Sequence, residues 1–490
     1  MSNASGQSMS QSMSQSTSAS TSTLASKRVI IVGAGLAGSL LACLLARDGW
    51  SVRVYEKRPD PRAKGYLGGR SINLALSARG LAGLAAAGLD RLVMQQDAIA
   101  MSQRGLHARS GEYSVQPYSS NPTDAINSVS RGGLNLTLIN AAAQAPGVEM
   151  HFDRPCLDVD LSKPAAIFQT PHGTERVEAD LIVATDGAFS AVRLAMMKTD
   201  RFDYSQTYLE HGYKELHIPA GPGASYAIEK HALHIWPRGG AMMIALPNRD
   251  GSFTCTLFWP FKGEHSFESL EGPHERRASG PIVPTGDDLA RVNAFFRAEY
   301  PDAAALMPTL ASDFFTNPTS SLVTVRCWPW QRHGRVCLLG DAAHAIVPFY
   351  GQGMNAAFED CVQLARDLRE ERNQHAALER YEIARKPSAD AIADMALENF
   401  VEMRDLAGRA DFQYRKRIER TLHAALGDIA LPQYNLVSFS TVPYERAQAQ
   451  GKRLARVYEE VALRVPPERT EALSDAAWNA EVTGIARPLL

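Results

Sequence analysis

Hydrophobic and polar residues follow a regular pattern at the start of the folded part of the chain. The segment KRVIIVGAGLAGSLLACLLARDGWSVRVYEKR (27–58) opens with an apolar run, Val29 to Val32, that is typical of a buried strand. After a glycine turn come leucines at helical spacing, at positions 36, 40, 41, 44 and 45. Gly49 ends the predicted helix, and a second apolar run ends at Glu56. The pattern predicts a strand–helix–strand unit with parallel strands.

Two later segments show the same succession of an apolar run, an acid and a glycine. ADLIVATDGAFSAVR (179–193) predicts a buried strand that ends at Asp186 and Gly187. GRVCLLGDAAHAIVPFYGQGMNAAFEDC predicts a strand that ends at Gly340 and Asp341, then a loop and a helix from about Met354. Open α/β sheets bind ligands at the carboxyl ends of their strands, so both acids are candidate ligand-binding residues.

The middle of the chain has strand periodicity and the end has helical periodicity. The alternating run 202–261 predicts a sheet, and helices are expected after about residue 375. SQRGLHARSGEYSVQPYSS predicts a hairpin that turns at Ser110 and Gly111. A loop centred on Gly111 places Arg104 opposite Tyr118, and a slip of one residue would still leave the two neighbours. Farther along, Asn399 falls within an apolar helical stripe and needs a hydrogen-bond partner.

Composition and charge narrow the classes of protein. With 490 residues, 45% of them hydrophobic, the chain is long enough for two or more domains. A formal net charge of -2 argues against nucleic acid or an acidic membrane surface as partner. Six scattered cysteines without a CxxC pair favour buried thiols, and no apolar run reaches the roughly 18 residues that span a bilayer. Residues 1–26, serine-rich and without charge, predict a disordered tail and no leader, so we expect a cytoplasmic protein without a membrane partner.

The glycine turn of the first unit has the spacing of a dinucleotide site. Gly33 permits the tight turn, Gly35 lets the backbone approach a pyrophosphate, and Gly38 permits close packing of helix and strand. Glu56 follows at about the distance expected of an acid that binds a ribose hydroxyl. This pattern leaves NAD and FAD open. GQGMNA is not a second such unit, because it follows Pro348 rather than a strand, so no separate nicotinamide domain is predicted.

Together, the three segments resemble, in order and spacing, the flavin motifs of class A aromatic hydroxylases of the para-hydroxybenzoate hydroxylase type. Five further segments closely resemble the kynurenine 3-monooxygenase family, and the resemblance runs from about residue 27 to 440: GRSINLALSARG (69–80), SVSRGGLN (128–135), VPFYGQGMNAAFEDC, ENFVEMR (398–404) and LPQYNLVSFS (431–440).

The resemblance implies an α/β fold in which a discontinuous, Rossmann-like FAD-binding domain carries a β-sheet substrate domain and a C-terminal helical region. The expected boundaries are 1–26 for the tail; 27–92, 128–195 and 326–367 for the FAD-binding domain; 93–127 and 196–325 for the substrate domain; and 368–490 for the helical region.

The resemblance also implies the site residues. The substrate carboxylate would be held by Arg104, Tyr118, Asn399 and Tyr434, and the flavin face would be lined by Pro348, Phe349 and Tyr350. FAD would contact Gly33, Gly35, Ala37, Gly38, Tyr55, Glu56, Lys57, Arg58, Ala75, Arg131, Leu157, Asp186, Asp341, Gly353, Met354 and Asn355. No metal is expected: His344 has no ligand partner at helical spacing, and we interpret it as a hydrogen-bonded structural histidine.

The activity implied is hydroxylation of L-kynurenine to 3-hydroxy-L-kynurenine through a flavin C4a-hydroperoxide. FAD would be bound tightly, NADPH would bind transiently, and O2 would be the oxidant; the pathway would be tryptophan degradation or NAD biosynthesis. No side chain is expected to be an obligatory nucleophile or proton-transfer catalyst. Tyr350 stands where relatives vary, and the membrane-anchoring C-terminal helix of the eukaryotic enzymes is missing, as in the soluble bacterial form.

Three alternatives stay open, and the oligomeric state is not predicted. One is a sibling flavin hydroxylase of another aryl acid. A second is a flavin halogenase, suggested by WPWQRHG (328–334), which lacks the Ile-Pro that follows in the halogenase motif. The third is a non-enzymatic FAD-binding regulator.

Overall fold

The computed structural model describes residues 27–64, 72–119, 121–272, 282–406, 409–470 and 473–490. The predicted tail, 1–26, and the first three residues of GRSINLALSARG, 69–71, lie outside these ranges.

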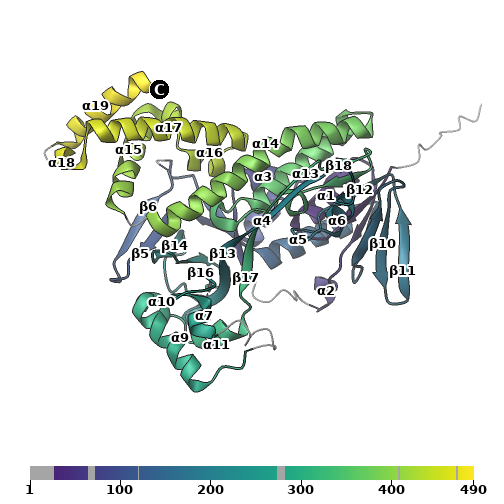
Figure 1. Ribbon diagram of the computed structural model, residues 1–490, viewed down its shortest axis with the longest axis horizontal. Coiled ribbons are helices and arrows are strands. Elements are labelled where there is room, and N and C mark those ends of the chain that lie inside the picture. The colour runs from purple at the N-terminus through teal and green to yellow at the C-terminus, as the bar shows by residue number, and fades with distance from the viewer. Residues whose placement is uncertain (1–26, 65–71, 120, 273–281, 407–408, 471–472) are drawn as a thin grey trace, which may run out of the picture.

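A mostly parallel sheet of six strands forms the centre of the first domain (Figure 1). Its order is β18 (Gln331–Arg332), β19 (Val336–Leu338), β12 (Leu181–Ala184), β1 (Arg28–Val32), β2 (Ser51–Tyr55) and β8 (Val148–His151). Only β18 pairs antiparallel. The strand–helix–strand prediction is confirmed, with α1 (Leu36–Arg47) between β1 and β2. Strand β1 is an unbroken apolar run because residues 29–32 are buried, as expected of a parallel strand covered on both faces.

Two smaller sheets accompany this domain. One has the order β11 (Gly173–Glu178), β10 (Ala165–Thr170), β9 (Cys156–Asp160), and the other β3 (Asn73–Leu76), β7 (Ile126–Ser130), β4 (Ala98–Met101). The helices of this region are α2 (Pro61–Lys64), α3 (Ala78–Ala86), α4 (Asp90–Gln96), α5 (Arg131–Gln144) and α6 (Ala191–Met196).

A seven-stranded sheet forms the second layer, as the alternation in 202–261 predicts. Its order is β17 (Ser320–Trp328), β13 (Asp203–Ile218), β16 (Phe253–Pro260), β15 (Met242–Pro247), β14 (Ala232–Pro237), β5 (Gln103–His107) and β6 (Tyr113–Pro117). One face packs on the aromatic core of α7 (Phe267–Glu271), α9 (Gly286–Glu299), α10 (Pro301–Ala305) and α11 (Leu310–Thr316). Side chains of the other face point toward the six-stranded sheet and line the cavity described below.

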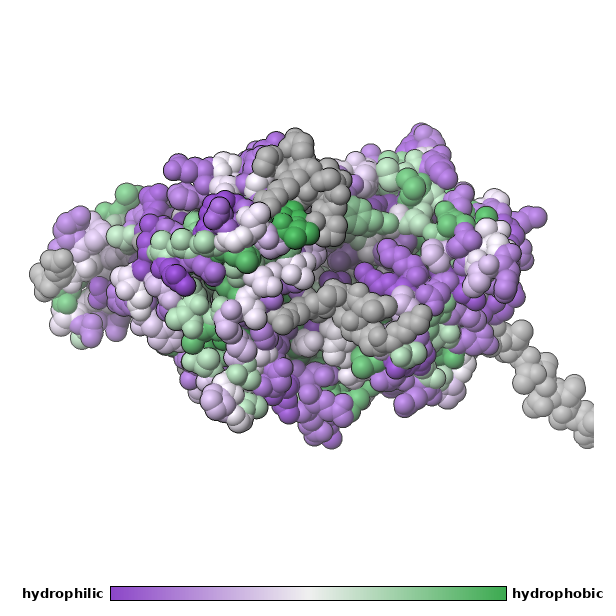
Figure 2. Space-filling view, turned by 90° about the horizontal axis from the view of Figure 1, so that it is seen from below, coloured by the Kyte–Doolittle hydropathy of each residue, from purple (hydrophilic) through white to green (hydrophobic). Residues whose placement is uncertain are grey.

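The last third of the chain is helical. The long α14 (Gln374–Val401) crosses the molecule from the six-stranded sheet toward a group of C-terminal helices at one end (Figure 1). The elements are α12 (Asp341–His344), η2 (Pro348–Tyr350), α13 (Gly353–Glu370), α14, the π-helical turn η3 (Glu402–Leu406), α15 (Ala410–Leu426), η4 (Gly427–Ala430), α16 (Gln433–Phe439), α17 (Tyr444–Arg464), α18 (Pro467–Thr470), α19 (Asp475–Ala486) and η5 (Arg487–Leu489). Among the described residues, none of these helices is both long and apolar enough to cross a membrane. On the face shown in Figure 2, hydrophobic residues lie between hydrophilic ones rather than as one continuous surface.

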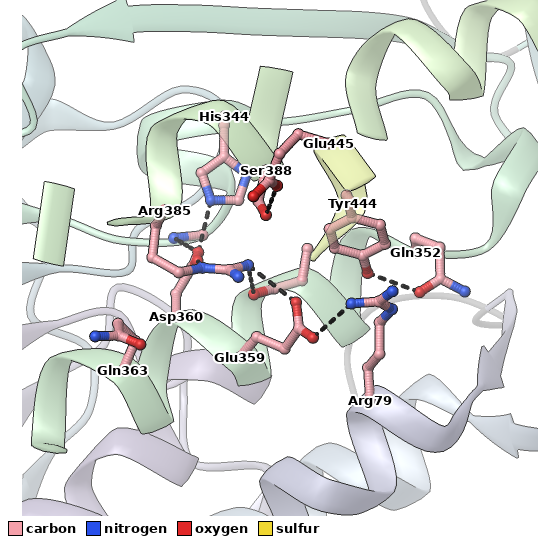
Figure 3. A network of polar contacts seen from close by, with 12 residues as sticks. Arg79, His344, Gln352, Glu359, Asp360, Gln363, Arg385, Ser388, Tyr444 and Glu445 are labelled. Carbon is pink, nitrogen blue, oxygen red and sulfur yellow. Dashed lines mark hydrogen bonds and ion pairs between the residues drawn. The ribbon is translucent and has the colours of Figure 1, made fainter. Parts of the chain in front are cut away.

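A buried network of charged side chains joins α12, α13 and α14 (Figure 3). The Asp360 carboxylate accepts hydrogen bonds from His344 Nε2 (2.6 Å), Arg385 Nε (2.6 Å) and the Gly340 backbone N–H (3.2 Å). Burial alone would raise the pKa of Asp360, but His344 and Arg385 lower it from 3.8 to about 2. His344 is therefore a buried partner of a carboxylate, as the sequence interpretation held, and it fixes the loop that follows β19.

Replacing Asp360 by asparagine is expected to lower the free energy of unfolding by about 3 kcal/mol, because Arg385 would keep only Glu359 as a counter-charge and His344 would lose its carboxylate partner. Because the pKa of Asp360 is 3.8 in the unfolded chain and about 2 in the folded protein, its stabilising contribution is complete above pH 3.8 and is lost as the pH falls through about 2. The urea midpoint at pH 7 and its pH dependence measure both effects. The matched control is Asp411→Asn, which removes an exposed ion pair with Arg409 and should change little. An Asp360→Asn midpoint equal to that of the wild type would contradict the assignment.

Candidate active site

A cavity of about 620 Å³ lies between the six-stranded and the seven-stranded sheets. It begins at the glycine turn after β1 and reaches the hairpin of β5 and β6, where Arg104 lines it. Its volume is within the range of small-molecule sites, and its walls combine apolar side chains with a few charged ones.

The glycine turn forms one end of the cavity, and each glycine has a separate physical reason. Gly33 has φ 104°, and a Cβ there would lie 2.6 Å from the Thr185 carbonyl oxygen. A Cβ on Gly38 would lie 2.0 Å from the Gly33 carbonyl oxygen, so α1 packs too closely on the turn for any side chain. At Gly35 a Cβ would meet no protein atom within 4 Å, and this residue faces the cavity. The turn leaves room for a ligand where Gly35 lies.

The end of β2 forms the wall beside the turn. The Glu56 carboxylate accepts hydrogen bonds from the Ala34 and Arg58 backbone N–H groups, both at 2.9 Å. These bonds fix the carboxylate beside the turn and at the cavity surface. Other predicted FAD contacts that line the cavity here are Ala37, Tyr55, Lys57, Arg58 and Arg131.

Asp186 follows β12, next to the glycine turn. One carboxylate oxygen accepts a hydrogen bond from the Ala191 N–H at 2.8 Å, whereas Oδ1 is buried and has no partner among the described residues. Burial raises the pKa of Asp186. A buried carboxylate oxygen without a donor needs one, and a ribityl or ribose hydroxyl would supply it. Asp341 lines the cavity from the first residue of α12.

The segment after η2 forms the middle of the cavity. Gly351 has φ 67°, a conformation that favours glycine, and Gly353 and Met354 line the wall at the start of α13. The Asn355 side chain turns away from the cavity: its amide donates to the Ala75 and Gly351 carbonyls (2.9 and 2.8 Å), and its oxygen accepts from the Ser77 N–H (3.0 Å). Asn355 therefore joins β3 to the loop and shapes the wall indirectly.

The structure brings most, but not all, of the predicted cofactor residues to the cavity surface. Gly38 and Asn355 shape the wall without lining it. Leu157 is half exposed on β9 and does not line the cavity, whereas its neighbour Cys156 does. No group of three or more metal-ligating side chains occurs in the part of the chain that the structure describes.

Arg104, Tyr350 and Tyr434 line the far end of the cavity, whereas Tyr118 contacts Arg104 without lining the cavity itself. The Arg104 Cζ lies 4.5 Å from the Tyr434 ring centroid and 5.2 Å from that of Tyr118, and the rings of Tyr350 and Tyr434 stack at 5.7 Å. Burial opposes the charge of Arg104, but Tyr434, Tyr118 and Glu402 raise its pKa above the usual value. No carboxylate of the described residues forms an ion pair with Arg104. A charged guanidinium that has no carboxylate at ion-pair distance among the described residues, and that lies beside two phenols, is suited to an anionic ligand.

The register of the hairpin differs from the prediction. Arg104 pairs with Gln116, and the Tyr118 N–H donates to the Ser102 carbonyl at 3.1 Å, so Tyr118 is opposite Ser102. The turn is centred on Ser110 rather than on Gly111. Arg104 and Tyr118 are nevertheless diagonal neighbours on one face, close enough for their side chains to meet.

Asn399 lies at the same end, on α14. Its amide donates to the Phe349 carbonyl oxygen at 2.7 Å and contacts the Met403 sulfur at 3.3 Å. A thioether is a weak acceptor, so a ligand carboxylate could take the second N–H. The first N–H joins α14 to η2, which presents Pro348, Phe349 and Tyr350 to the cavity.

Several lining residues were not singled out from the sequence. They project from the inner face of the seven-stranded sheet and include Tyr213, Leu233, Met242, Ile244, Thr256 and Phe258. The alternation of Met242, Ile244 and Leu246 indicates a shared face, but it does not indicate that this face meets a ligand.

Replacing Tyr118 by phenylalanine tests whether its hydroxyl serves a ligand. The hydroxyl is buried without a hydrogen-bond partner among the described residues, so its removal should not lower the melting temperature of the ligand-free protein. It should weaken binding of a carboxylate ligand about 10-fold or more, the equivalent of one charged hydrogen bond. Thermal unfolding and ligand titration measure the two effects. A lower melting temperature with unchanged affinity would assign the hydroxyl to the fold instead.

Comparison with known proteins agrees with this geometry. Residues 26–264 and 308–396 match a family model described as an FAD binding domain. A solved 2-methyl-3-hydroxypyridine-5-carboxylic acid oxygenase has the same fold, with a TM-score of 0.62 over 84% of this chain and 96% of that one, at 21% identity. The family match and the shared fold define an FAD-binding protein, which confirms the predicted fold class and cofactor.

More specific relatives are curated kynurenine 3-monooxygenases. The protein from Myxococcus xanthus is 46% identical over 92% of this chain and 94% of its own length. The protein from Dictyostelium discoideum is 45% identical over 89% of this chain and 94% of its own. The chain belongs to the kynurenine 3-monooxygenase family, as the sequence motifs indicated.

Proposed function

We propose that the protein hydroxylates L-kynurenine to 3-hydroxy-L-kynurenine, with FAD as bound cofactor and NADPH and O2 as co-substrates. The observation that carries the proposal is the guanidinium of Arg104, which forms no ion pair with a described carboxylate and lies beside Tyr118 and Tyr434 at the end of a cavity that begins at a dinucleotide cradle. An aromatic amino acid has the carboxylate that this end fits and a ring that would extend toward the middle of the cavity.

FAD fits the other end of the cavity. The open space at Gly35 fits a pyrophosphate, Glu56 fits a ribose, and the unpartnered oxygen of Asp186 fits a hydroxyl donor. Gly353 and Met354 would lie against the flavin ring, where the N-terminus of α13 favours negative charge. When bound, FAD takes electrons from NADPH and activates O2 for transfer of a hydroxyl group.

The chain's own residues bind, orient and exclude water. Arg104 would hold the carboxylate by charge-assisted hydrogen bonds, and Tyr118, Asn399 and Tyr434 would fix its angle. Pro348, Phe349 and Tyr350 would cover the flavin face, and Phe349 stacks on Phe400 at 4.3 Å. An apolar wall keeps water from the reacting atoms, which favours hydroxylation over release of hydrogen peroxide. We place this activity in the cytoplasm, in keeping with six cysteines that are all free thiols.

The test is NADPH oxidation by the FAD-loaded protein with and without L-kynurenine, with the mass of the product followed. Strong stimulation and a product heavier by one oxygen are expected. Stimulation that gives only hydrogen peroxide would make L-kynurenine a mimic of another aryl acid, since Arg104 would accept any such carboxylate. A panel of aryl acids would then identify the substrate. No stimulation would refute the substrate assignment.

A further inference from the structure

Arg79, from the SARG end of the GRSINLALSARG segment, is fully buried and bonds to two helices at once. Figure 3 shows its contact with Glu359. Its guanidinium donates to the carbonyl oxygens of Val437 (2.8 Å) and Leu436 (3.2 Å) in α16, and to that of Val442 just beyond it. On the other side it donates to the Glu359 carboxylate at 2.8 Å, in α13. Arg79 thus joins α13, which begins within the predicted flavin-contacting residues 351–355 (the flavin segment), to the short helix α16.

The α13 side of this connection is rigid. Glu359 also pairs with Arg385 at 3.1 Å, and Arg385 pairs with Asp360, whose carboxylate fixes His344 and the Gly340 backbone. The guanidinium of Arg79 also stacks on the Tyr444 ring at 3.9 Å. Tyr444 in turn donates a hydrogen bond to the Gln352 side chain at 2.8 Å, inside the flavin segment. Arg79 is therefore anchored to the cofactor wall by two routes.

The α16 side of the connection carries the substrate end of the cavity. Tyr434, in the first turn of α16, lies beside Arg104. The next residue, Asn435, is buried, and its amide reaches the Tyr118 carbonyl oxygen at 3.5 Å. A shift of α16 would thus displace Tyr434 and loosen Tyr118.

We infer that Arg79 is a positioning residue that sets the carboxylate-binding end of the cavity, through α16, at a fixed distance from the flavin segment. Three of its five N–H groups bind carbonyls of one short helix region, and a bulky cation is kept fully buried to do so. The SARG and LPQYNLVSFS segments lie some 350 residues apart in sequence, and the bonds of Arg79 to α16 bring them into contact. The consequence for catalysis rests on the proposed function.

The test compares Arg79→Lys, Tyr434→Phe and the double variant in FAD-loaded protein. Arg79→Lys should keep FAD, raise the dissociation constant for L-kynurenine about 10-fold, and raise the share of NADPH electrons released as hydrogen peroxide. Because Arg79 acts through α16, which carries Tyr434, the loss of affinity in the double variant should be clearly smaller than the product of the two single losses. The inference would be overturned if the affinity losses of the two single variants multiply in the double variant. It would also be overturned if Arg79→Lys keeps the wild-type affinity and coupling. Arg291→Lys, in α9 and remote from the cavity, is the matched control.

A second readout does not depend on the substrate. Hydrogen exchange of the backbone N–H groups in 433–439 should quicken at least 10-fold in Arg79→Lys without ligand, while exchange in 353–370 stays as in the wild type. Glu359→Gln keeps the bonds of Arg79 to α16 and weakens its contact with α13. It should raise peroxide release while hydrogen exchange in 433–439 stays as in the wild type. This variant replaces Arg79→Lys as the test if Arg79→Lys does not fold. If L-kynurenine does not stimulate NADPH oxidation by the wild type, the proposed function is refuted, but the inference about Arg79 is not. The exchange measurement then decides the inference, and unchanged exchange in 433–439 in Arg79→Lys overturns it.

Discussion

Replacing Arg104 by alanine is expected to raise the dissociation constant for L-kynurenine by 100-fold or more. Arg104 is the cation at the carboxylate end of the cavity, and each charged hydrogen bond that it forms would contribute about 1.5 to 3 kcal/mol. Two such bonds from one guanidinium account for at least a 100-fold loss. The variant should also release most of the oxygen it consumes as hydrogen peroxide, because a substrate without this anchor does not hold its ring in place.

Titration followed by flavin absorbance measures the affinity, and the ratio of product to NADPH measures the coupling. The matched control is Arg109→Ala, on the same hairpin. Arg109 is exposed and pairs with Glu299, so its loss should leave both values unchanged. An Arg104→Ala protein that keeps its FAD, its affinity and its coupling would refute the carboxylate role.

Replacing Gly35 by valine is expected to abolish FAD binding while the protein without FAD stays folded. A Cβ at this position meets no protein atom within 4 Å, and the backbone φ of −71° suits any residue. The added side chain would instead fill the space in which the pyrophosphate of FAD approaches the N-terminus of α1. Affinity for FAD should fall by more than 100-fold, since both the close approach and the backbone N–H contacts are lost.

The ratio of absorbance at flavin and protein wavelengths gives the FAD content, and thermal unfolding of FAD-free protein gives the stability. Gly38→Ala provides the contrast, because its Cβ would lie 2.0 Å from the Gly33 carbonyl oxygen and should lower stability even without FAD. If Gly35→Val lost as much stability as Gly38→Ala, the open space at Gly35 would be a packing requirement rather than a cofactor site.

The sequence correctly predicted those helices and strands whose hydrophobic residues, spaced at the period of a helix or strand, are the residues that the structure buries. The apolar run at β1, the leucine spacing of α1 and the glycines of the turn all express contacts within a few tens of residues. Alternation in 202–261 likewise predicted the sheet, because one face of each strand meets an apolar core.

Other features depend on partners that no local pattern specifies. The hairpin register was wrong because the chain reverses at Ser110, so that Gly111 follows the centre of the turn. The Asn355 side chain turns to Ala75 and Ser77, which are about 280 residues distant in sequence. The place of Asn399 beside Phe349 needs the packing of α14 on η2. Motif resemblance named these residues, but only the assembled chain shows what each one touches.

The strand order also bears on how the protein is made. Strand β1 lies between β2 and β12, and β12 pairs with β19, which ends at Leu338. A ribosome adding about 5 to 20 residues per second needs roughly 20 to 70 s to reach Asn355, at the start of the last segment of the flavin wall. The β1 edge of the apolar β1–β2 pair has no partner strand until β12 (Leu181–Ala184) is made, and β12 in turn has none until β19 is made. The nascent chain therefore exposes an unpaired, aggregation-prone strand edge until residue 338 is reached. Newly made protein should therefore depend on chaperones until β12 and β19 arrive, and only then become able to capture its flavin.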